Sequence, residues 1–239
     1  MLNIIKVNNE QQFNETGAGI IASLLQSKPR AILGLATGGT PVGVYQKLVE
    51  LYREGVISFK QASSYNLDEY VGLPEDHPES YRRFMNEKLF NHIDINMENT
   101  HVPSGNSEQA AADYTQLLEQ AGQIDLQLLG VGHNGHIGFN EPGENLHGPT
   151  HIIELDEVTR QANARYFPSI DDVPTHAVTM GIGTILQAKQ ILLMAKGADK
   201  AEIIARALKG PITTQCPASL LQTHANVVVV VDQAAGELL

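Results

Sequence analysis

The stretch LLGVGHNGHIGFNEPG, residues 128–143, places two imidazoles, a carboxylate and five glycines after a short apolar run. Leu128 and Leu129 are typical of the end of a buried strand, and the glycines let the backbone approach a ligand closely. His136 and Glu141 share the loop, where a carboxylate can orient an imidazole that moves protons near neutral pH. A glycine-rich turn with a structural histidine is the alternative, but this density of polar groups favours the catalytic loop of an α/β enzyme.

Short apolar runs alternate with longer amphipathic stretches along the rest of the chain, which predicts an α/β fold with a mostly parallel sheet covered by helices. The expected strands are a first one at the N-terminus and residues 31–36, 63–67, 124–130, 190–195 and 226–231. The expected helices are residues 11–27, 41–54, 80–92, 107–121 and 199–208. Unbroken apolar runs suit strands buried on both faces, and we expect residues 1–239 to form one domain.

Composition narrows the class of protein. A net charge of -11 argues against nucleic acid or an anionic membrane as partner, because both favour basic patches. No window is long and apolar enough for a membrane span, and the N-terminal apolar run is soon interrupted by acidic and amide residues, so we expect a cytoplasmic protein. The single Cys216 excludes an internal disulfide and a cysteine-based zinc site.

The glycine turn ATGGTP, residues 36–41, follows a predicted strand and opens a predicted helix. Amides at such a helix start, reached through Gly38, Gly39 and Thr40, can bind an anion with help from the helix dipole. Pro41 suits the first helical position, and Thr40 could cap the helix. The turn predicts a phosphate cradle, although a tight strand-to-helix turn without a ligand fits it equally well.

Two adjacent acids follow another predicted strand in NLDEYVGLPEDHPESY, residues 66–81. Because consecutive side chains of an extended segment point to opposite sides, only one of Asp68 and Glu69 is expected to face a ligand, and we choose Asp68. A carboxylate beside a carbon acid can act as the base for enolisation without a cofactor. An acid that only braces the loop is the alternative.

Candidate cations lie in TRQANARYFP, residues 159–168, and GADKAEII, residues 197–204, which supply Arg165 and Lys200. Taken singly, each is more often a solvated surface residue than a ligand. His133 and His136 lie three apart on a glycine-broken loop without the helical frame of zinc motifs, so no metal site is expected.

Five stretches occur in one order along the chain, and the resemblance that they carry covers nearly the whole chain. They are LGLATGGTP (33–41), NLDEYVGLPEDHPESY (66–81), GVGHNGHIGFNEPG (130–143), TRQANARYF (159–167) and AVTMG (177–181). With these five stretches together, the chain resembles the glucosamine-6-phosphate deaminases. The resemblance implies a Rossmann-like fold and conversion of glucosamine 6-phosphate and water to fructose 6-phosphate and ammonia, in amino-sugar catabolism and without metal or nucleotide cofactor.

The resemblance also implies catalytic roles. His136, oriented by Glu141 and assisted by Asn134, would open the sugar ring, and Asp68 would move the proton from C2 to C1. Some family members carry aspartate where this chain has Asn134, so Glu141 is expected to be the main partner of the histidine.

The binding roles follow from the same likeness. The amides of Gly38, Gly39 and Thr40 with the side chains of Arg165 and Lys200 look like a phosphate clamp. Backbone at Gly130 and Gly138 is expected to contact sugar hydroxyls. The segment 154–174, which holds Arg165, is a candidate lid over the sugar phosphate.

The chain departs from allosteric family members, whose effector site includes basic and hydroxylic residues where this chain has Glu144, His151, Ile153 and Glu154. We therefore expect an unregulated enzyme that is a monomer or small homo-oligomer.

Two alternative functions stay open. One is a 6-phosphogluconolactonase, whose ester hydrolysis needs no enolising base. The other is a non-catalytic sugar-phosphate sensor, which would not need Asp68, His136 and Glu141.

Overall fold

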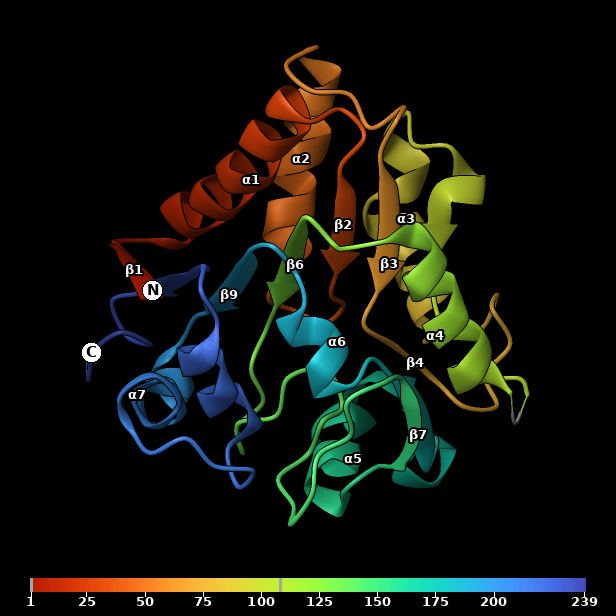
Figure 1. The fold of residues 1–239 in the computed structure, drawn as a ribbon, viewed down its shortest axis with the longest axis vertical. Helices are drawn as coiled ribbons and strands as arrows, with labels where there is room; N and C mark the ends of the chain where they lie inside the picture. Colours follow the sequence, from red (N-terminus) through yellow and green to blue (C-terminus); the bar gives the residue numbers. More distant parts are fainter. Residues whose placement is uncertain (1, 108) are drawn as a thin grey trace.

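A seven-stranded parallel sheet forms the centre of the structure, a computed structural model that describes residues 2–107 and 109–239 (Figure 1). Its strand order is β1-β10-β9-β6-β2-β3-β5, and every neighbouring pair is parallel. These strands are β1 (Leu2–Val7), β2 (Ile32–Leu35), β3 (Ser63–Asn66), β5 (Thr100–His101), β6 (Leu126–Leu129), β9 (Ile191–Ala195) and β10 (Val227–Asp232). The mostly parallel α/β architecture predicted from the sequence is confirmed.

Helices connect these strands. These helices are α1 (Glu10–Ser27), α2 (Val42–Arg53), α3 (Tyr81–Lys88), α4 (Ala110–Ala121), α5 (Glu157–Asn163), α6 (Ile182–Leu186) and α7 (Ala201–Lys209). All of them except α5 and α6, which the sequence did not predict, lie within or close to the predicted ranges. The expected helix 80–92 ends early and gives way to a 3-10 turn at Phe90–His92. The expected helix 107–121 includes residue 108, which lies outside the described residues, and its described part starts at Ala110.

The start of α2 differs from the expectation. The helix begins at Val42, so Pro41 is its N-cap residue rather than its first helical residue. No side chain caps this helix, and the suggested cap by Thr40 is wrong. The backbone of Pro41 is already helical, with φ -80° and ψ -8°, and Tyr45 N donates to the Pro41 carbonyl. The helix therefore starts without a side-chain cap and leaves the Thr40 hydroxyl unused by α2.

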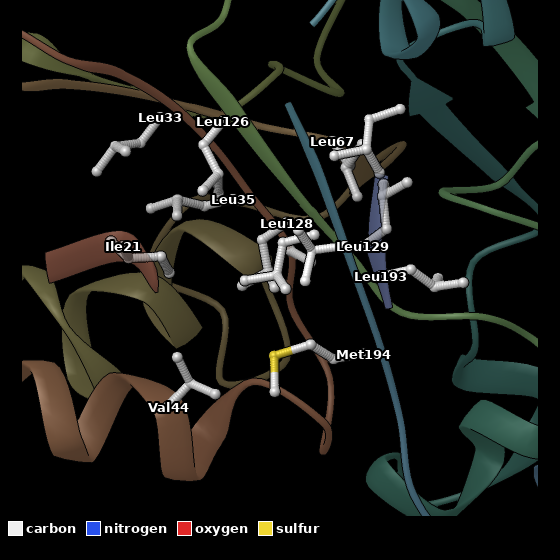
Figure 2. Close-up of a cluster of buried hydrophobic side chains, with 14 of the residues drawn as sticks. Ile21, Leu33, Leu35, Val44, Leu67, Leu126, Leu128, Leu129, Leu193 and Met194 are labelled. Carbon is white, nitrogen blue, oxygen red and sulfur yellow. The ribbon is translucent and has the colours of Figure 1, made fainter. Parts of the chain in front are cut away.

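The core lies on both faces of the sheet. All five residues of β9 and the five valines of β10 are buried, although their side chains alternate between the faces. Figure 2 shows the Met194 thioether directed toward Val44 of α2, whereas the side chain of the preceding residue, Leu193, points away from Val44. Burial on both faces explains why these strands are continuous apolar runs in the sequence.

A second, antiparallel sheet of order β4-β8-β7 lies beside the carboxyl ends of the parallel strands. Its strands are β4 (Asp68–Tyr70), β8 (His176–Thr179) and β7 (His151–Glu154). It has its own apolar cluster, made by Tyr70, Phe139, Leu155, Phe167, Val173 and Ala177. Only Leu67 separates β3 from β4, so the chain passes directly from one sheet into the other. This change of sheet fixes the direction in which Asp68 points.

Within residues 2–107 and 109–239, no helix has the length and apolar character to cross a bilayer.

Candidate functional site

The loops after β2, β3, β6 and β9 converge on one pocket of about 240 Å³, at the carboxyl ends of the parallel strands. The segment that includes α5 closes one side. The lining residues are Ala36, Thr37, Gly38, Gly39, Thr40, Leu67, Asp68, Tyr81, Gly130, Val131, Gly132, His133, Asn134, His136, Gly138, Phe139, Thr159, Asn163, Arg165 and Lys200. Every site residue expected from the sequence lines this pocket except Glu141, which lies directly behind His136.

Asp68 is the buried carboxylate of the pocket, with 7% of its surface exposed. Burial, together with the nearby charge of Glu69, raises its pKa to about 8. Gly138 lies close by with φ +57°, and a Cβ there would be 3.0 Å from Thr179 Oγ1 and 3.6 Å from Asp68 Oδ2. Glycine at this position therefore lets the histidine loop approach the carboxylate.

Glu69 points away from the pocket and caps the start of α3. Its Oε1 accepts from Tyr70 N at 2.9 Å and from Tyr81 N at 3.0 Å, and its Oε2 accepts from Arg82 N at 3.0 Å. Burial raises the pKa of Glu69, and these backbone hydrogen bonds act in the opposite direction. The two adjacent acids therefore lie on opposite sides of the strand, and Asp68 alone of the pair lines the pocket.

Glu141 is the centre of a hydrogen-bond network beneath His136. Its Oε2 accepts from Asn134 Nδ2 at 2.6 Å and lies 3.2 Å from His136 Nδ1, while its Oε1 accepts from Thr159 Oγ1 at 2.6 Å. Burial acts to raise the pKa of Glu141, but the hydrogen bonds and the charge of His136 outweigh it, so the pKa is lowered. A charged Glu141 accepts a hydrogen bond from the Nδ1–H of a neutral His136. The other ring nitrogen, Nε2, then carries no proton and can accept one.

The backbone around His136 is also fixed. Its N–H donates to Asn134 Oδ1 at 3.1 Å, and Gly132 N donates to the His136 carbonyl at 3.0 Å. A Cβ on Gly132 would overlap the imidazole ring, so glycine is needed there for the ring to fold back over the loop. The conformation of the loop thus holds both the ring and its carboxylate partner.

Lys200 and Arg165 bring positive charge to the pocket from separate segments. Among the residues that the structure describes, neither forms an ion pair with a carboxylate within 4.0 Å. Burial lowers the pKa of Lys200, and the positive charge of Arg165 adds to this effect, whereas Asp199 opposes it. Two cationic side chains beside a glycine turn form a site suited to an anion.

His133, whose role the sequence left open, lies at the pocket edge. Its Nε2 is 2.8 Å from Asp199 Oδ2, so it links the histidine loop to the turn before α7. In residues 2–107 and 109–239, no group of three or more His, Cys, Asp or Glu side chains is placed to hold a metal ion.

Sequence reasoning missed Thr159, Asn163 and Tyr81, which all line the pocket. Thr159 and Asn163 are four residues apart on α5 and so share one face of that helix. This spacing is visible in TRQANARYF and could have indicated a polar face. Arg160, on the same helix, instead donates to the carbonyls of Ile170 and Val173.

A larger pocket of about 990 Å³ lies at the opposite ends of the strands. It is lined by the segments that precede β6, β9 and β10, including Ile124, Lys189 and Ala225, and by parts of α4 and α6. None of the expected site residues lines it. The smaller pocket, where the predicted groups converge, is therefore the candidate active site.

The chain is similar to known proteins along nearly its whole length. A family model described as glucosamine-6-phosphate isomerases/6-phosphogluconolactonase matches residues 8–230. The chain is 49% identical to a glucosamine-6-phosphate deaminase from Geobacillus sp. (strain WCH70), covering 100% of this chain and 96% of that protein. It is 50% identical to a glucosamine-6-phosphate deaminase from Bacillus pumilus (strain SAFR-032), covering 99% and 100%.

Two solved structures are similar to this chain to different degrees. A monomeric glucosamine-6-phosphate deaminase superposes with a TM-score of 0.96 at 45% identity and covers 99% of this chain and 100% of its own. A 6-phosphogluconolactonase from Thermotoga maritima has a TM-score of 0.77 at 24% identity, covering 97% and 100%, and this likeness concerns the fold alone.

Proposed function

The chain belongs to the family of glucosamine-6-phosphate isomerases and 6-phosphogluconolactonases, and within it we propose the activity of a glucosamine-6-phosphate deaminase. The reaction takes glucosamine 6-phosphate and water to fructose 6-phosphate and ammonia, an aldose-ketose isomerisation with deamination in amino-sugar catabolism. Identity of 45–50% to deaminases over nearly the full chain supports this activity over lactone hydrolysis.

One observation carries the proposal: Asp68 and His136 line the same small pocket from different strand ends. Deamination with isomerisation needs two separate proton transfers, one at the ring oxygen and one at carbon. Lactone hydrolysis needs no base directed at a carbon atom. A buried carboxylate with a pKa raised to about 8 is suited to the carbon step, because its basicity once ionised exceeds that of an ordinary aspartate.

His136 is assigned to ring opening. With Nδ1 bonded to the charged Glu141, its Nε2 can take the proton of the anomeric hydroxyl and pass it to the ring oxygen. The C1–O bond of the ring breaks, and the open-chain aldehyde forms. Asn134 supports this step by donating to the same oxygen of Glu141 that faces the imidazole.

Asp68 is assigned to the carbon step. The carboxylate takes the C2 proton while the C1 carbonyl oxygen takes a proton from the protonated C2 amine, giving an enolamine. Asp68 then returns its proton to C1, giving a protonated ketimine. Water then adds to the C2–N double bond, and ammonia leaves with the formation of the C2 carbonyl. A protonated amine on C2 of the incoming sugar would favour the ionised form of Asp68, since an opposite charge nearby lowers a carboxyl pKa.

The phosphate is assigned to the turn at Gly38, Gly39 and Thr40 with Arg165 and Lys200. Holding the phosphate fixes where the sugar lies in the pocket, so that Asp68 meets C2 rather than a neighbouring carbon. Backbone at Gly130 and Gly138, which also line the pocket, is assigned to the sugar hydroxyls.

Arg165→Ala tests the clamp. We expect it to raise KM roughly tenfold or more with a smaller loss of kcat, because a phosphate contact acts in substrate binding and in the transition state alike. Steady-state kinetics with glucosamine 6-phosphate measure both constants. Equal losses in kcat and kcat/KM, with KM unchanged, would instead place Arg165 in the chemical step.

The activity itself is tested with metal-chelated protein and glucosamine 6-phosphate, following ammonia and fructose 6-phosphate in separate coupled assays. Equal rates of the two products are expected. Hydrolysis of 6-phosphogluconolactone without either product would favour the lactonase alternative, and binding of the sugar phosphate without turnover would favour a sensor.

Regulation and assembly belong to the same proposal. We expect a monomer or small homo-oligomer without allosteric control, with 154–174 as a segment that closes over the bound sugar. Similarity to a monomeric deaminase supports the first part. A sigmoidal substrate curve that N-acetylglucosamine 6-phosphate converts to a hyperbolic one would contradict it.

A further inference from the structure

Thr159 reaches the histidine loop from a distant part of the chain. It lies on α5, one helical turn before Asn163, and both side chains line the pocket. Thr159 is 5% exposed, so its hydroxyl is shielded from bulk water. Arg165 follows directly in the next turn, at Ala164–Tyr166. The same short segment thus carries Thr159, which contacts the catalytic loop, and Arg165, which is assigned to the phosphate.

The hydroxyl of Thr159 forms a hydrogen bond with one carboxylate oxygen of Glu141, and the histidine loop contacts the other oxygen. Asn134 and His136 both lie against Oε2, whereas Thr159 Oγ1 donates to Oε1 at 2.6 Å. The last torsion of a glutamate side chain is soft, so a carboxylate held by one oxygen can rotate about it. With its two oxygens held from two different elements, the carboxylate plane of Glu141 is fixed.

The same hydrogen bond bears on the charge of Glu141. Burial acts to raise its pKa, and the hydrogen bond from Thr159 is one of those that lower it. Without that donor, a buried carboxylate oxygen would lose its partner in a place that water reaches poorly. Glu141 would then be less well oriented and less well stabilised as the anion that His136 needs.

We propose that Thr159 is a positioning residue for sugar-ring opening, holding Glu141 so that Oε2 meets His136 Nδ1. The inference rests on the deaminase activity proposed above and adds a residue to it. Thr159 does not act on the carbon step, because its hydroxyl bonds to Glu141 rather than to Asp68.

The test compares Thr159→Val, which removes the hydroxyl at nearly constant shape, with Thr159→Ser, which keeps it. Loss of a hydrogen bond to a charged group should lower kcat/KM of Thr159→Val about tenfold or more, whereas Thr159→Ser should stay within about threefold of the wild type. Thr115→Val is the matched control, since Thr115 also lies on a helix, α4, and its hydroxyl donates back to the Ala111 carbonyl of the same helix. It should leave kinetics unchanged.

The deciding readout is the isotope effect on kcat/KM with substrate deuterated at C2. Deuterium slows the carbon step of Asp68 and not ring opening, so slower ring opening in Thr159→Val should move the effect toward 1. If the wild-type effect is already near 1, the comparison is made with Asp68→Glu as parent, in which the carbon step is slower. Thr159→Ala is the second variant if Thr159→Val does not fold by circular dichroism.

Three results would overturn the inference: unchanged kcat/KM in Thr159→Val, an isotope effect that stays the same or grows, or Thr159→Ser as impaired as Thr159→Val. Each of these requires a wild-type protein that makes fructose 6-phosphate and ammonia. A wild type that makes neither product would instead reject the proposed function, so the two failures are distinguishable.

Discussion

Asp68 and Glu141 are two buried carboxylates of one active-site region, yet their pKa values move in opposite directions. Asp68 is 7% exposed, and among the described residues no hydrogen bond to its carboxylate is found, so burial raises its pKa to about 8. The Glu141 side chain is 9% exposed but accepts from three side chains, and its pKa is lowered. Asp68 is the more deeply buried of the two and has no such donors in the described part of the chain, so burial raises its pKa, whereas the donors around Glu141 outweigh the burial of that carboxylate.

The difference matches the two proposed roles. A base that must take a proton from carbon benefits from a carboxylate that the protein leaves unsatisfied. A partner that must hold an imidazole benefits from a carboxylate that stays charged throughout. The first is supplied by a short strand between two sheets, and the second by a glycine-rich loop braced by α5.

Asp68→Asn should have the largest effect. The amide cannot take the C2 proton, so kcat should fall by about 10³-fold, within the range that general acid–base catalysis contributes. Coupled measurement of fructose 6-phosphate gives the rate. Asp113→Asn, at an exposed position on α4, is the control and should keep full activity. A variant at Asp68 that retains more than a tenth of the wild-type rate would contradict its role as the base.

Glu141→Gln should have a smaller effect. The imidazole of His136 stays in the pocket but loses its charged partner, so kcat should fall roughly 10- to 100-fold, as for other residues that orient a catalytic group. The same assay measures it. A loss equal to that of Asp68→Asn would mean that Glu141 takes part in the carbon step and would remove the proposed division of roles.

The two carboxylates should also differ in their effects on stability. Because the folded pKa of Asp68 is raised from 3.8 to about 8, its contribution is fully present below about pH 4 and is lost as the pH rises through 8. The folded pKa of Glu141 is lowered, so its contribution is present above its unfolded pKa of 4.5 and is lost as the pH falls.

At about pH 9, Asp68→Asn should therefore raise the melting temperature by roughly 3 °C or more, and Glu141→Gln should lower it. Both differences should shrink near pH 4. Thermal melts followed by circular dichroism at the two pH values measure them. Shifts of the same sign for the two variants at pH 9 would show that donors do not distinguish the two sites.

Asn134→Asp should have the smallest effect. The change removes a donor to Glu141 Oε2 and adds a second carboxylate, which should raise the pKa of Glu141 and make its surroundings more like those of Asp68. Because similar enzymes are expected to carry aspartate here, kcat/KM should fall only about threefold at neutral pH, with a larger loss on the acid side. A pH–rate profile checks this expectation, and a loss beyond about a hundredfold would contradict it.

The sequence predicted the parallel sheet well because strands such as β9 and β10 are buried on both faces and must be apolar throughout. It did not predict the second sheet, since β4 has three residues and pairs with β8 more than a hundred residues later. Neither the short strand nor its distant partner has a periodicity that can be read locally.

Residues of the candidate site could be predicted where a motif coincides with a strand end, as for Asp68 and His136. Thr159 was missed because its partner Glu141 lies 18 residues away and is brought close only by the fold. The opposite pKa directions of Asp68 and Glu141 were also beyond the sequence, because both are acids in polar motifs and only the structure gives the donors around each.

The most direct test of the account is a pH titration of both carboxyl carbons by 13C NMR, with Asp and Glu labelled and the two signals assigned by Asp68→Asn and Glu141→Gln. We expect the Asp68 signal to titrate near pH 8 and the Glu141 signal below 4.5. A midpoint for Asp68 near its ordinary value of 3.8, or a Glu141 midpoint above that of Asp68, would contradict the claim that hydrogen-bond donors set the two roles.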